Sequence, residues 1–284
     1  MINILLTGAS GFIGSNILEK IKKNNNIFVL TRVKKKIKKD NNVKYITFNS
    51  YDQLSKKLKT IKINTIIHCA THYKKKHEYK DIKKFLESNI LLGNILLENL
   101  NQMKVKKFVN FSTTWESSNN SEINPRNLYA AYKKSFFYIL QYYKQLNPQI
   151  RFIDLIIADT FGENDRRNKI INALRENYKK NKITKIISKK LYLNLLNVKD
   201  IVDAIQIILD KNVKSNRYIL KNPIYINIKK LISKINNEKT KRIKVKYLSN
   251  IFIKDKIFKY QELKTWKPKQ SSLENIKELI IKYK

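Results

Sequence analysis

Three glycines near the N-terminus constrain the fold of this chain more than any other feature. Gly8, Gly11 and Gly14 lie in the stretch LLTGASGFIG. An apolar run, Ile2–Leu6, precedes this stretch, and helical periodicity covers Phe12–Lys23. Glycines at this spacing allow a tight turn, close approach of the backbone to a pyrophosphate, and close helix–strand packing. We therefore predict a dinucleotide-binding turn with the helix N-terminus toward the phosphates. A purely structural turn is the alternative.

Apolar runs and amphipathic segments alternate through the first half of the chain. We expect strands at Ile2–Leu6, Ile27–Arg32, Lys44–Phe48, Thr65–His68, Lys106–Ser112 and Phe152–Ile157. We expect helices at Phe12–Lys23, Lys80–Leu100 and Leu128–Tyr143. This order is typical of an α/β fold with helices on both faces of a parallel sheet. The sequence thus predicts a doubly wound Rossmann domain over residues 1–160.

The rhythm changes after Phe161. Helices are expected at Lys169–Lys180, Lys199–Leu209, Ile228–Ile235 and Leu273–Tyr283, and strands at Arg217–Leu220 and Ile243–Tyr247. This pattern indicates a smaller C-terminal α/β lobe over residues 161–284, with some segments returning to the first domain. We expect this lobe to bind the substrate, since ligand sites favour the cleft between two closely packed lobes.

The net charge of +38 raises the question of a nucleic-acid partner. Of the 60 basic residues, 52 are Lys and only 8 are Arg, and they are spread along the chain. Base recognition leans on Arg, and the abundant Lys, Ile and Asn share AT-rich codons. We therefore assign the charge to a biased genome and expect no nucleic-acid partner.

The same composition excludes other classes. One Cys cannot form a disulfide framework or a Cys-based zinc site, and three His are too few for a His-rich metal site. No apolar run reaches the roughly 18 residues of a membrane helix, and the N-terminus lacks a signal-peptide pattern. We expect a cytoplasmic protein with no membrane partner.

The second expected strand ends at Arg32, followed by Lys34 and Lys35. An NAD site usually carries an acidic residue here, which holds the ribose 2′-hydroxyl. A guanidinium pairs instead with a 2′-phosphate. Arg32 therefore favours NADP(H), while NAD(H) stays possible, and a surface cation is the other interpretation.

A Tyr–Lys pair one helical turn apart is a candidate acid, because a nearby cation lowers the pKa of a tyrosine. The chain contains five such pairs, so spacing alone does not select one. Tyr129 and Lys133 follow a strand that ends in Ser112, Thr113 and Thr114. This position predicts a Ser/Thr–Tyr–Lys triad.

Eight motifs in chain order resemble those of the extended short-chain dehydrogenase/reductases, the NAD-dependent epimerase/dehydratase family. They are LLTGASGFIG, IIHCAT, ESNILLGNILLENL, FVNFSTT, YAAYK, DTFGENDRR, LLNVKDIVDAI and TWKPKQSSLENIKELI. The similarity covers essentially the whole chain. It implies a Rossmann domain and oxidoreduction with a nicotinamide dinucleotide.

A closer resemblance is to the sugar-nucleotide 4-ketoreductases of the CDP-abequose and CDP-paratose synthase kind. Residues 70–75, ATHYKK, and 87–89, ESN, are similar to their motifs after the fourth strand. This resemblance implies reduction of the C4 ketone of a nucleotide-linked deoxyhexulose by NADPH. The 4,6-dehydratases carry Asp-Glu where this chain has Thr114 and Trp115, which argues against dehydration.

The resemblance also implies roles for individual residues. Thr113 matches the hydroxyl that binds the C4 oxygen, Tyr129 the proton donor, and Lys133 the residue that holds the nicotinamide ribose. The expected cofactor contacts are Gly8, Ser10, Gly11, Phe12, Ile13, Gly14, Arg32, Ala70, Asn89, Tyr129 and Lys133. The expected substrate contacts are Thr71, Tyr73, Thr114, Trp115 and Arg166, and no metal ligand is expected.

The chain is therefore predicted to be an NADPH-dependent reductase of nucleotide-diphosphate 4-keto-deoxyhexoses. Such sugars enter surface polysaccharides such as lipopolysaccharide O-antigen or capsule. The alternative is an NAD-dependent 4-epimerase with the same triad, and a non-catalytic NADP-binding protein is a third possibility. The resemblance further implies a homodimer formed through the helices at Lys80–Leu100 and Leu128–Tyr143.

Overall fold

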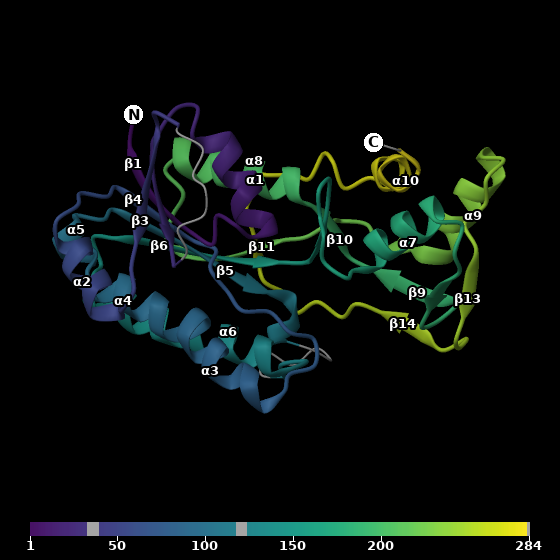
Figure 1. Cartoon of the computed structure of the whole chain (residues 1–284), viewed down its shortest axis with the longest axis horizontal. Coiled ribbons are helices and arrows are strands. Elements are labelled where there is room, and N and C mark those ends of the chain that lie inside the picture. The colour runs from purple at the N-terminus through teal and green to yellow at the C-terminus, as the bar shows by residue number, and fades with distance from the viewer. Residues whose placement is uncertain (33–39, 118–123, 283–284) are drawn as a thin grey trace. The chain divides into compact units, whose positions relative to one another are not determined.

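The computed structural model describes residues 1–32, 40–117 and 124–282, which divide into two compact units (Figure 1). Unit 1 consists of Met1–Ile156, Ile205–Ile219 and Ile257–Leu263. Unit 2 consists of Ile157–Ala204, Leu220–Lys256 and Lys264–Lys284. Lys34 and Lys35 lie outside the described residues.

An eight-stranded sheet forms the centre of unit 1, in the order β15-β11-β6-β5-β4-β1-β2-β3. Its strands are β1 (Asn3–Thr7), β2 (Asn26–Thr31), β3 (Val43–Thr47), β4 (Thr65–His68), β5 (Lys107–Thr113), β6 (Arg151–Ile157), β11 (Asn216–Leu220) and β15 (Gln261–Glu262). The pairs β1–β2, β1–β4, β2–β3 and β4–β5 are parallel. Strand order reverses at β1, and a doubly wound domain binds ligands at that reversal. The predicted fold class is thus confirmed.

Helices cover the sheet of unit 1. They are α1 (Phe12–Ile21), α2 (Tyr51–Lys59), α3 (Ile82–Phe85), α4 (Leu92–Glu98), α5 (Leu100–Met103) and α6 (Leu128–Leu146), with the short turns η1 (Tyr79–Asp81), η2 (Leu86–Leu91) and η3 (Thr114–Glu116). Every residue of β4 and β5 is buried, as expected for parallel strands covered on both faces. A Cβ on Gly93 would lie 2.3 Å from the Phe136 ring, so this glycine allows α4 to pack closely on α6.

Two helices of unit 1 differ from the sequence prediction. The helix expected over Lys80–Leu100 is interrupted by the π-helical turn η2, a feature that is common at functional sites. The prediction also missed α2. Its N-cap Ser50 accepts a hydrogen bond from the Gln53 amide, and this Ser-x-x-Gln spacing was a readable start signal.

Unit 2 is a smaller α/β assembly. Its elements are β7 (Asp159–Phe161), α7 (Ile170–Lys179), β8 (Thr184–Ile186), β9 (Lys190–Leu193), β10 (Leu195–Asn197), β12 (Ile226–Asn227), α9 (Ile228–Glu238), β13 (Val245–Tyr247), β14 (Phe252–Lys254) and α10 (Leu273–Ile281). The helix α8 (Val198–Asp210) begins in unit 2 and continues into unit 1. Apolar residues of α7, α9 and α10 form one core with those of β8 and β9. Tyr283, the last residue of the predicted terminal helix, lies outside the described residues.

Two of the motifs quoted above meet inside unit 2. Asp200 is 1% exposed and accepts hydrogen bonds from the Lys269 and Gln270 amides and the Ser271 hydroxyl. The Trp266 indole N–H donates to the Asp200 carbonyl oxygen at 2.8 Å. These contacts explain why an aspartate opens α8 and a tryptophan precedes α10. Within the described part of the chain, no helix has the length and apolar character needed to cross a bilayer.

Candidate active site

The glycine turn joins the carboxyl end of β1 to the start of α1. Gly8 has φ +70°, and a Cβ there would lie 2.7 Å from the backbone nitrogen of Ala70. A Cβ on Gly14 would lie 2.2 Å from the Gly8 carbonyl oxygen, so the turn closes only when positions 8 and 14 carry no side chain. Gly11 is the N-cap of α1, and the first turn carries neither a side-chain cap nor an acidic residue. The positive end of α1, with Ser10, Phe12 and Ile13, can therefore face a pyrophosphate.

A hydrogen-bonded pair joins β1 to β4 where the strand order reverses. Thr7 Oγ1 lies 2.9 Å from His68 Nδ1 and accepts a hydrogen bond from the Ala70 amide at 3.0 Å. Burial, assisted by the Lys133 charge, lowers the pKa of His68 to about 3, so its ring is neutral at neutral pH. Burial also raises the pKa of the Cys69 thiol. Sequence reasoning missed the role of Thr7, which holds Ala70 beside the glycine turn, and of His68, which hydrogen-bonds Thr7.

Asn89 anchors the loop that follows β4. Its Oδ1 accepts the His72 amide at 2.7 Å, and its Nδ2 donates to the His72 carbonyl at 3.1 Å. The Thr71 hydroxyl donates to the same Oδ1 at 3.2 Å. Asn89 is 2% exposed and lies on the π-helical turn η2. The expected cofactor residue Asn89 and the expected substrate residue Thr71 are therefore neighbours.

The expected catalytic threonine ends β5 and caps the turn η3. Thr113 Oγ1 accepts a hydrogen bond from the Trp115 amide at 3.3 Å, while the Thr113 amide donates to Glu116 Oε1 at 3.2 Å. This reciprocal pair is a capping box. Since Thr113 Oγ1 is an acceptor in the turn, its own proton can be donated elsewhere. Thr114 is buried beside it.

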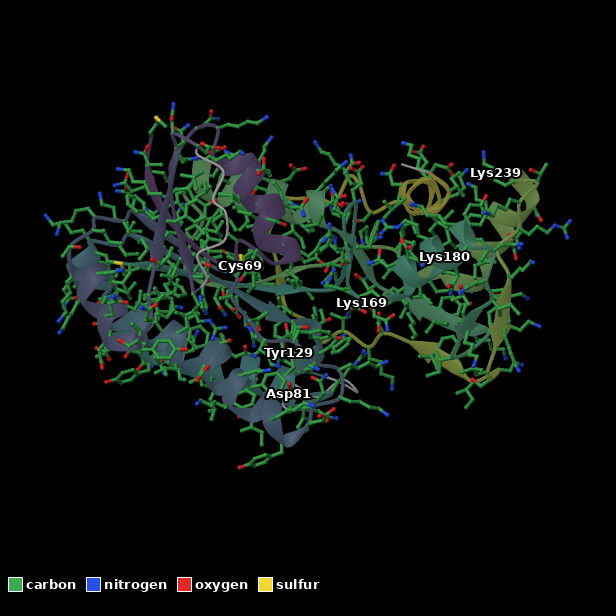
Figure 2. All side chains as sticks on the ribbon, viewed as in Figure 1. Cys69, Asp81, Tyr129, Lys169, Lys180 and Lys239 are labelled. Carbon is green, nitrogen blue, oxygen red and sulfur yellow. The ribbon has the colours of Figure 1, made fainter. Side chains whose placement is uncertain are left out.

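Tyr129, which is labelled in Figure 2, opens α6 together with Leu128. Lys133 lies one turn further along this helix, which Asn127 caps by accepting the Ala130 amide. The Tyr129 ring packs edge-on against Tyr73, with centroids 5.0 Å apart, and Tyr73 lies 6.0 Å from the Trp115 ring. The expected substrate residue Tyr73 therefore contacts the expected proton donor, and the expected substrate residue Trp115 lies beside Tyr73.

Lys133 is 4% exposed. Burial lowers its pKa, while the negative charges of Glu116 and Asp154 act in the opposite direction. A buried ammonium beside carboxylates is held in place electrostatically as well as sterically. Sequence reasoning did not identify Glu116 or Asp154, because neither belongs to a recognised motif.

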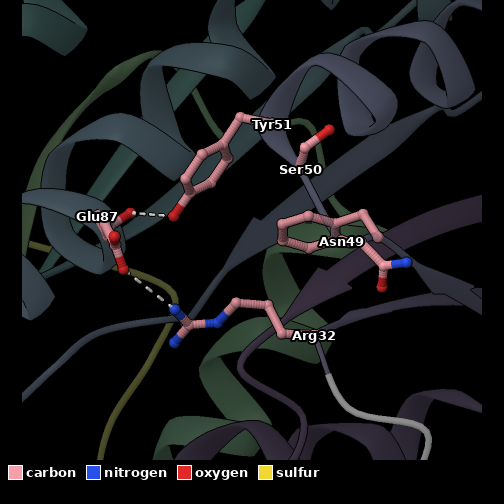
Figure 3. A pocket seen from close by; sticks show the side chains of 6 residues that line it. Arg32, Asn49, Ser50, Tyr51 and Glu87 are labelled. Carbon is pink, nitrogen blue, oxygen red and sulfur yellow. Dashed lines mark hydrogen bonds and ion pairs between the residues drawn. The ribbon is translucent and has the colours of Figure 1, made fainter.

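Arg32 faces a pocket of about 340 Å³ lined by Arg32, Phe48, Asn49, Ser50, Tyr51 and Glu87 (Figure 3). Its Nη1 lies 3.6 Å from Glu87 Oε2, and its Nη2 donates to the Ser88 hydroxyl at 3.5 Å. The Tyr51 hydroxyl donates to the Glu87 carbonyl at 3.3 Å. Burial and the Glu87 charge raise the pKa of Tyr51. The pocket therefore presents a cation and an anion together, and the sequence indicated only the cation.

The two arginines of unit 2 that follow β7 differ in environment. Arg167 is bound by Asp165, with Nε to Oδ1 at 2.8 Å, and donates from Nη2 to the Thr160 carbonyl at 2.9 Å. Its guanidinium therefore serves the local fold. Arg166 is exposed, which leaves it the better candidate for a diphosphate. Within the described residues, no three His, Cys, Asp or Glu side chains gather as a metal site.

Unit 1 belongs to the class of dinucleotide-binding α/β domains, since its glycine turn meets the sheet where the strand order reverses. The chain is a member of the NAD dependent epimerase/dehydratase family, whose profile matches residues 4–220.

Individual relatives are more distant. The chain is 26% identical over 204 residues to a CDP-abequose synthase of Yersinia pseudotuberculosis, covering 71% of each chain. It is 30% identical over 252 residues to a dTDP-D-glucose 4,6-dehydratase of Dictyostelium discoideum, covering 76% of this chain and 57% of that one. The crystal structure of a UDP-glucose 4-epimerase of Thermotoga maritima with UDP-glucose is similar with a TM-score of 0.81 and 19% identity. That similarity covers 98% of this chain and 97% of the epimerase, and it concerns the fold.

Proposed function

We propose that the chain reduces the C4 ketone of a nucleotide-diphosphate 4-keto-deoxyhexose with NADPH. The observation that carries this proposal is the hydrogen bonding of Thr113. Its Oγ1 accepts the Trp115 amide, which leaves the hydroxyl proton to be donated to another acceptor, and a carbonyl oxygen of the substrate fits that role. The similarity to CDP-abequose synthases supports the same substrate class.

A bound nicotinamide dinucleotide supplies the hydride that adds to C4. The Thr113 hydroxyl donates to the C4 oxygen and stabilises the charge that develops there. The Tyr129 phenol then gives its proton to that oxygen. The Lys133 ammonium, one helical turn away, stabilises the phenolate that remains.

The cofactor fits residues of unit 1. The glycine turn leaves no space for side chains at Gly8 and Gly14, so a pyrophosphate can approach the backbone. Ala70 and Asn89 border the same end of the sheet and would line the nicotinamide half. Arg32 would pair with the 2′-phosphate of NADPH at the mouth of its pocket.

Unit 1 offers side chains that fit the sugar. Tyr73 and Trp115 offer aromatic faces beside Tyr129, and rings of this kind pack well on a deoxysugar. Thr71, whose hydroxyl lies 3.2 Å from Asn89 Oδ1, and the buried Thr114 are the other proposed substrate contacts. Within unit 2, the exposed Arg166 is the candidate cation for a diphosphate group.

One observation favours the second candidate, an NAD-dependent 4-epimerase. Glu87 places a carboxylate 3.6 Å from Arg32 in the pocket at the end of β2, and a carboxylate there can hold the ribose hydroxyls of NAD. The same Thr113, Tyr129 and Lys133 would then oxidise and re-reduce C4. A protein that only binds the dinucleotide would not need these three side chains.

A homodimer is also proposed. The π-helical turn η2 and the helix α6 carry exposed apolar side chains, and contiguous apolar surface marks association sites. These side chains, between 40% and 58% exposed, are Leu86, Leu91, Tyr138, Tyr142 and Leu146. A surface-polysaccharide role follows from the proposed product and stands or falls with it.

The decisive experiment incubates the purified chain with NADPH and CDP- or dTDP-linked 4-keto-6-deoxyhexose. Loss of NADPH absorbance matched by formation of a 6-deoxyhexose nucleotide supports the reductase. A parallel incubation uses UDP-glucose, which carries a C4 hydroxyl. Tightly bound NAD and inversion at C4 without a net change in the cofactor would establish the epimerase instead. Absence of both reactions contradicts either enzyme.

A further inference from the structure

A buried network of charged side chains lies next to the Thr113 turn, entirely within unit 1. Its members are Glu116, Asp154 and Arg217, whose side chains are 0%, 2% and 9% exposed. Arg217 is on β11 and donates from Nε to Asp154 Oδ2 at 2.8 Å. Its Nη2 donates to Glu116 Oε2. One guanidinium thus bridges two carboxylates that come from distant parts of the chain.

The Glu116 end of the network holds the backbone of Thr113. The carboxylate that accepts Arg217 at Oε2 accepts the Thr113 amide at Oε1, at 3.2 Å. Burial raises the pKa of Glu116, and Arg217 acts in the opposite direction. Arg217 therefore favours the ionised form of Glu116, the form that accepts the Thr113 amide.

The Asp154 end holds the strand that leads to Thr113. Asp154 Oδ1 accepts hydrogen bonds from Asn110 Nδ2 and Ser112 Oγ, both at 2.7 Å. Both donors are on β5, which ends at Thr113. Arg217 is thus connected to β5 through Asp154 and to the following turn through Glu116.

The network also reaches the helix of the proton donor. The Arg217 guanidinium carbon lies 3.8 Å from the ring centroid of Phe137 on α6. Phe137 follows Tyr129 and Lys133 at successive intervals of four residues, so all three share one helix face. Stacking on this ring fixes the distance between the α6 face and the β5 end.

We infer that Arg217 is a positioning residue, which through Glu116 and Asp154 holds the Thr113 hydroxyl in register with Tyr129 and Lys133. This inference rests on the proposed reaction at C4, whether ketoreduction or epimerisation. Stability alone does not account for the network, since apolar side chains of similar volume often stabilise a core as well as buried charges do. The hydrogen bonds converge instead on the turn that carries the reactive hydroxyl.

The test is a double-mutant cycle between Glu116→Gln and Thr113→Val, with Arg217→Lys as a second probe. Glu116→Gln preserves shape and removes the charge that pairs with Arg217. We expect kcat to fall by about tenfold or more, with KM and the cofactor Kd within about threefold. In the Thr113→Val background the same substitution should change kcat by less than about twofold, since its effect acts through that hydroxyl. Arg217→Lys keeps the positive charge but cannot bridge both carboxylates in the same way, so we expect it to lower kcat by less than Glu116→Gln does.

The matched control is Lys107→Met, which removes a buried cation from the opposite end of the same strand, where Lys107 donates to the Ile208 carbonyl. Its effect on kcat should be equal in both backgrounds. If Glu116→Gln lowers kcat equally in the wild-type and Thr113→Val backgrounds, the inference is overturned, because a general loss of structure has that signature.

Amide hydrogen exchange separates this inference from the proposed function. Exchange at Thr113 and Trp115 should accelerate about tenfold or more in Glu116→Gln, since the capping box is weakened. Unchanged exchange would show that the network does not stabilise the turn. Suppose instead that exchange accelerates in the variant while the wild-type chain catalyses neither C4 reaction. That result would contradict the proposed function and the catalytic role, and it would still establish that the network stabilises the turn.

Discussion

The guanidinium Nη1 of Arg32 lies 3.6 Å from Oε2 of Glu87, across the pocket at the end of β2 (Figure 3). The cation that would recognise a 2′-phosphate is therefore already beside an anion. On the proposed function, binding of NADPH would exchange this ion pair for an Arg–phosphate pair, with the carboxylate still close to the incoming charge. Cofactor preference would then depend on two residues from different elements.

Neutralising this carboxylate should shift the preference toward NADP(H). For Glu87→Gln we expect the affinity for NADPH relative to NADH to rise by about two- to fivefold, because a partly exposed pair contributes at most ~1 kcal/mol. Fluorescence titration with both cofactors measures the ratio at two salt concentrations, and the gain should shrink at the higher one.

The matched variant is Arg32→Ala, which should lower the same ratio. If Glu87→Gln instead weakens NADH binding and leaves NADPH binding unchanged, Glu87 holds the ribose hydroxyls, and the epimerase becomes the better proposal.

Removing the phenol of Tyr129 tests the proton donor. Tyr129→Phe should lower kcat by about 10²- to 10⁴-fold, the usual contribution of general acid catalysis. The cofactor Kd should change little, because the ring and its contact with Tyr73 are kept. Steady-state kinetics and cofactor titration measure the two quantities.

Tyr132→Phe is the control on the same helix, since it keeps the Tyr132 ring, which stacks on Phe85 with centroids 5.3 Å apart. It should leave kcat within about twofold. Comparable losses in the two variants would remove Tyr129 from its proposed role.

A methyl group at Gly14 should damage dinucleotide binding. The added Cβ would lie 2.2 Å from the Gly8 carbonyl oxygen, and backbone cannot move aside as a flexible side chain can. We expect Gly14→Ala to destabilise the fold by ~1–3 kcal/mol and to weaken binding of both cofactors. Thermal unfolding and titration measure these effects.

Gly11→Ala provides the comparison, because its Cβ would lie 3.2 Å from the same oxygen. A milder loss is expected there. Equal tolerance of both substitutions would contradict the steric account of the turn.

The buried His68 should make the fold sensitive to mild acid. Its pKa is lowered from 6.5 to about 3, so the unfolded chain binds a proton that the folded chain does not. The stability that the neutral ring provides is complete above pH 6.5 and is lost as the pH falls toward 3, at up to ~1.4 kcal/mol per pH unit. Denaturant unfolding between pH 7.5 and pH 5 should record this slope.

His68→Asn keeps a polar partner for Thr7 and removes the titration, so its curve should be flatter over that interval. Carboxylates with lowered pKa, such as Asp81, titrate below it. A variant with the wild-type slope would assign the acid sensitivity to other groups.

Most of unit 1 could be predicted because its signals are local. The strand Thr65–His68 was predicted with its observed bounds, and Leu128–Tyr143 extends only to Leu146. The π-helical turn η2 could not be predicted from the sequence, since the apolar periodicity of the helix continues through it. Asn89 lies within this turn, and its side chain satisfies both backbone groups of His72, a tertiary contact that the apolar pattern does not indicate.

The sequence by itself determined most of the order of strands and helices in unit 1, the glycine turn, and the choice of Thr113, Tyr129 and Lys133 as candidate catalytic residues. These depend on short-range periodicity, on sterics that only glycine satisfies, and on motifs within a few residues. Only the tertiary structure decided what surrounds them. Arg217 reaches Glu116 across 101 positions of sequence because β11 joins the sheet beside β6, the strand that carries Asp154. Such pairings follow from which strands become neighbours, and no local pattern in the chain encodes that.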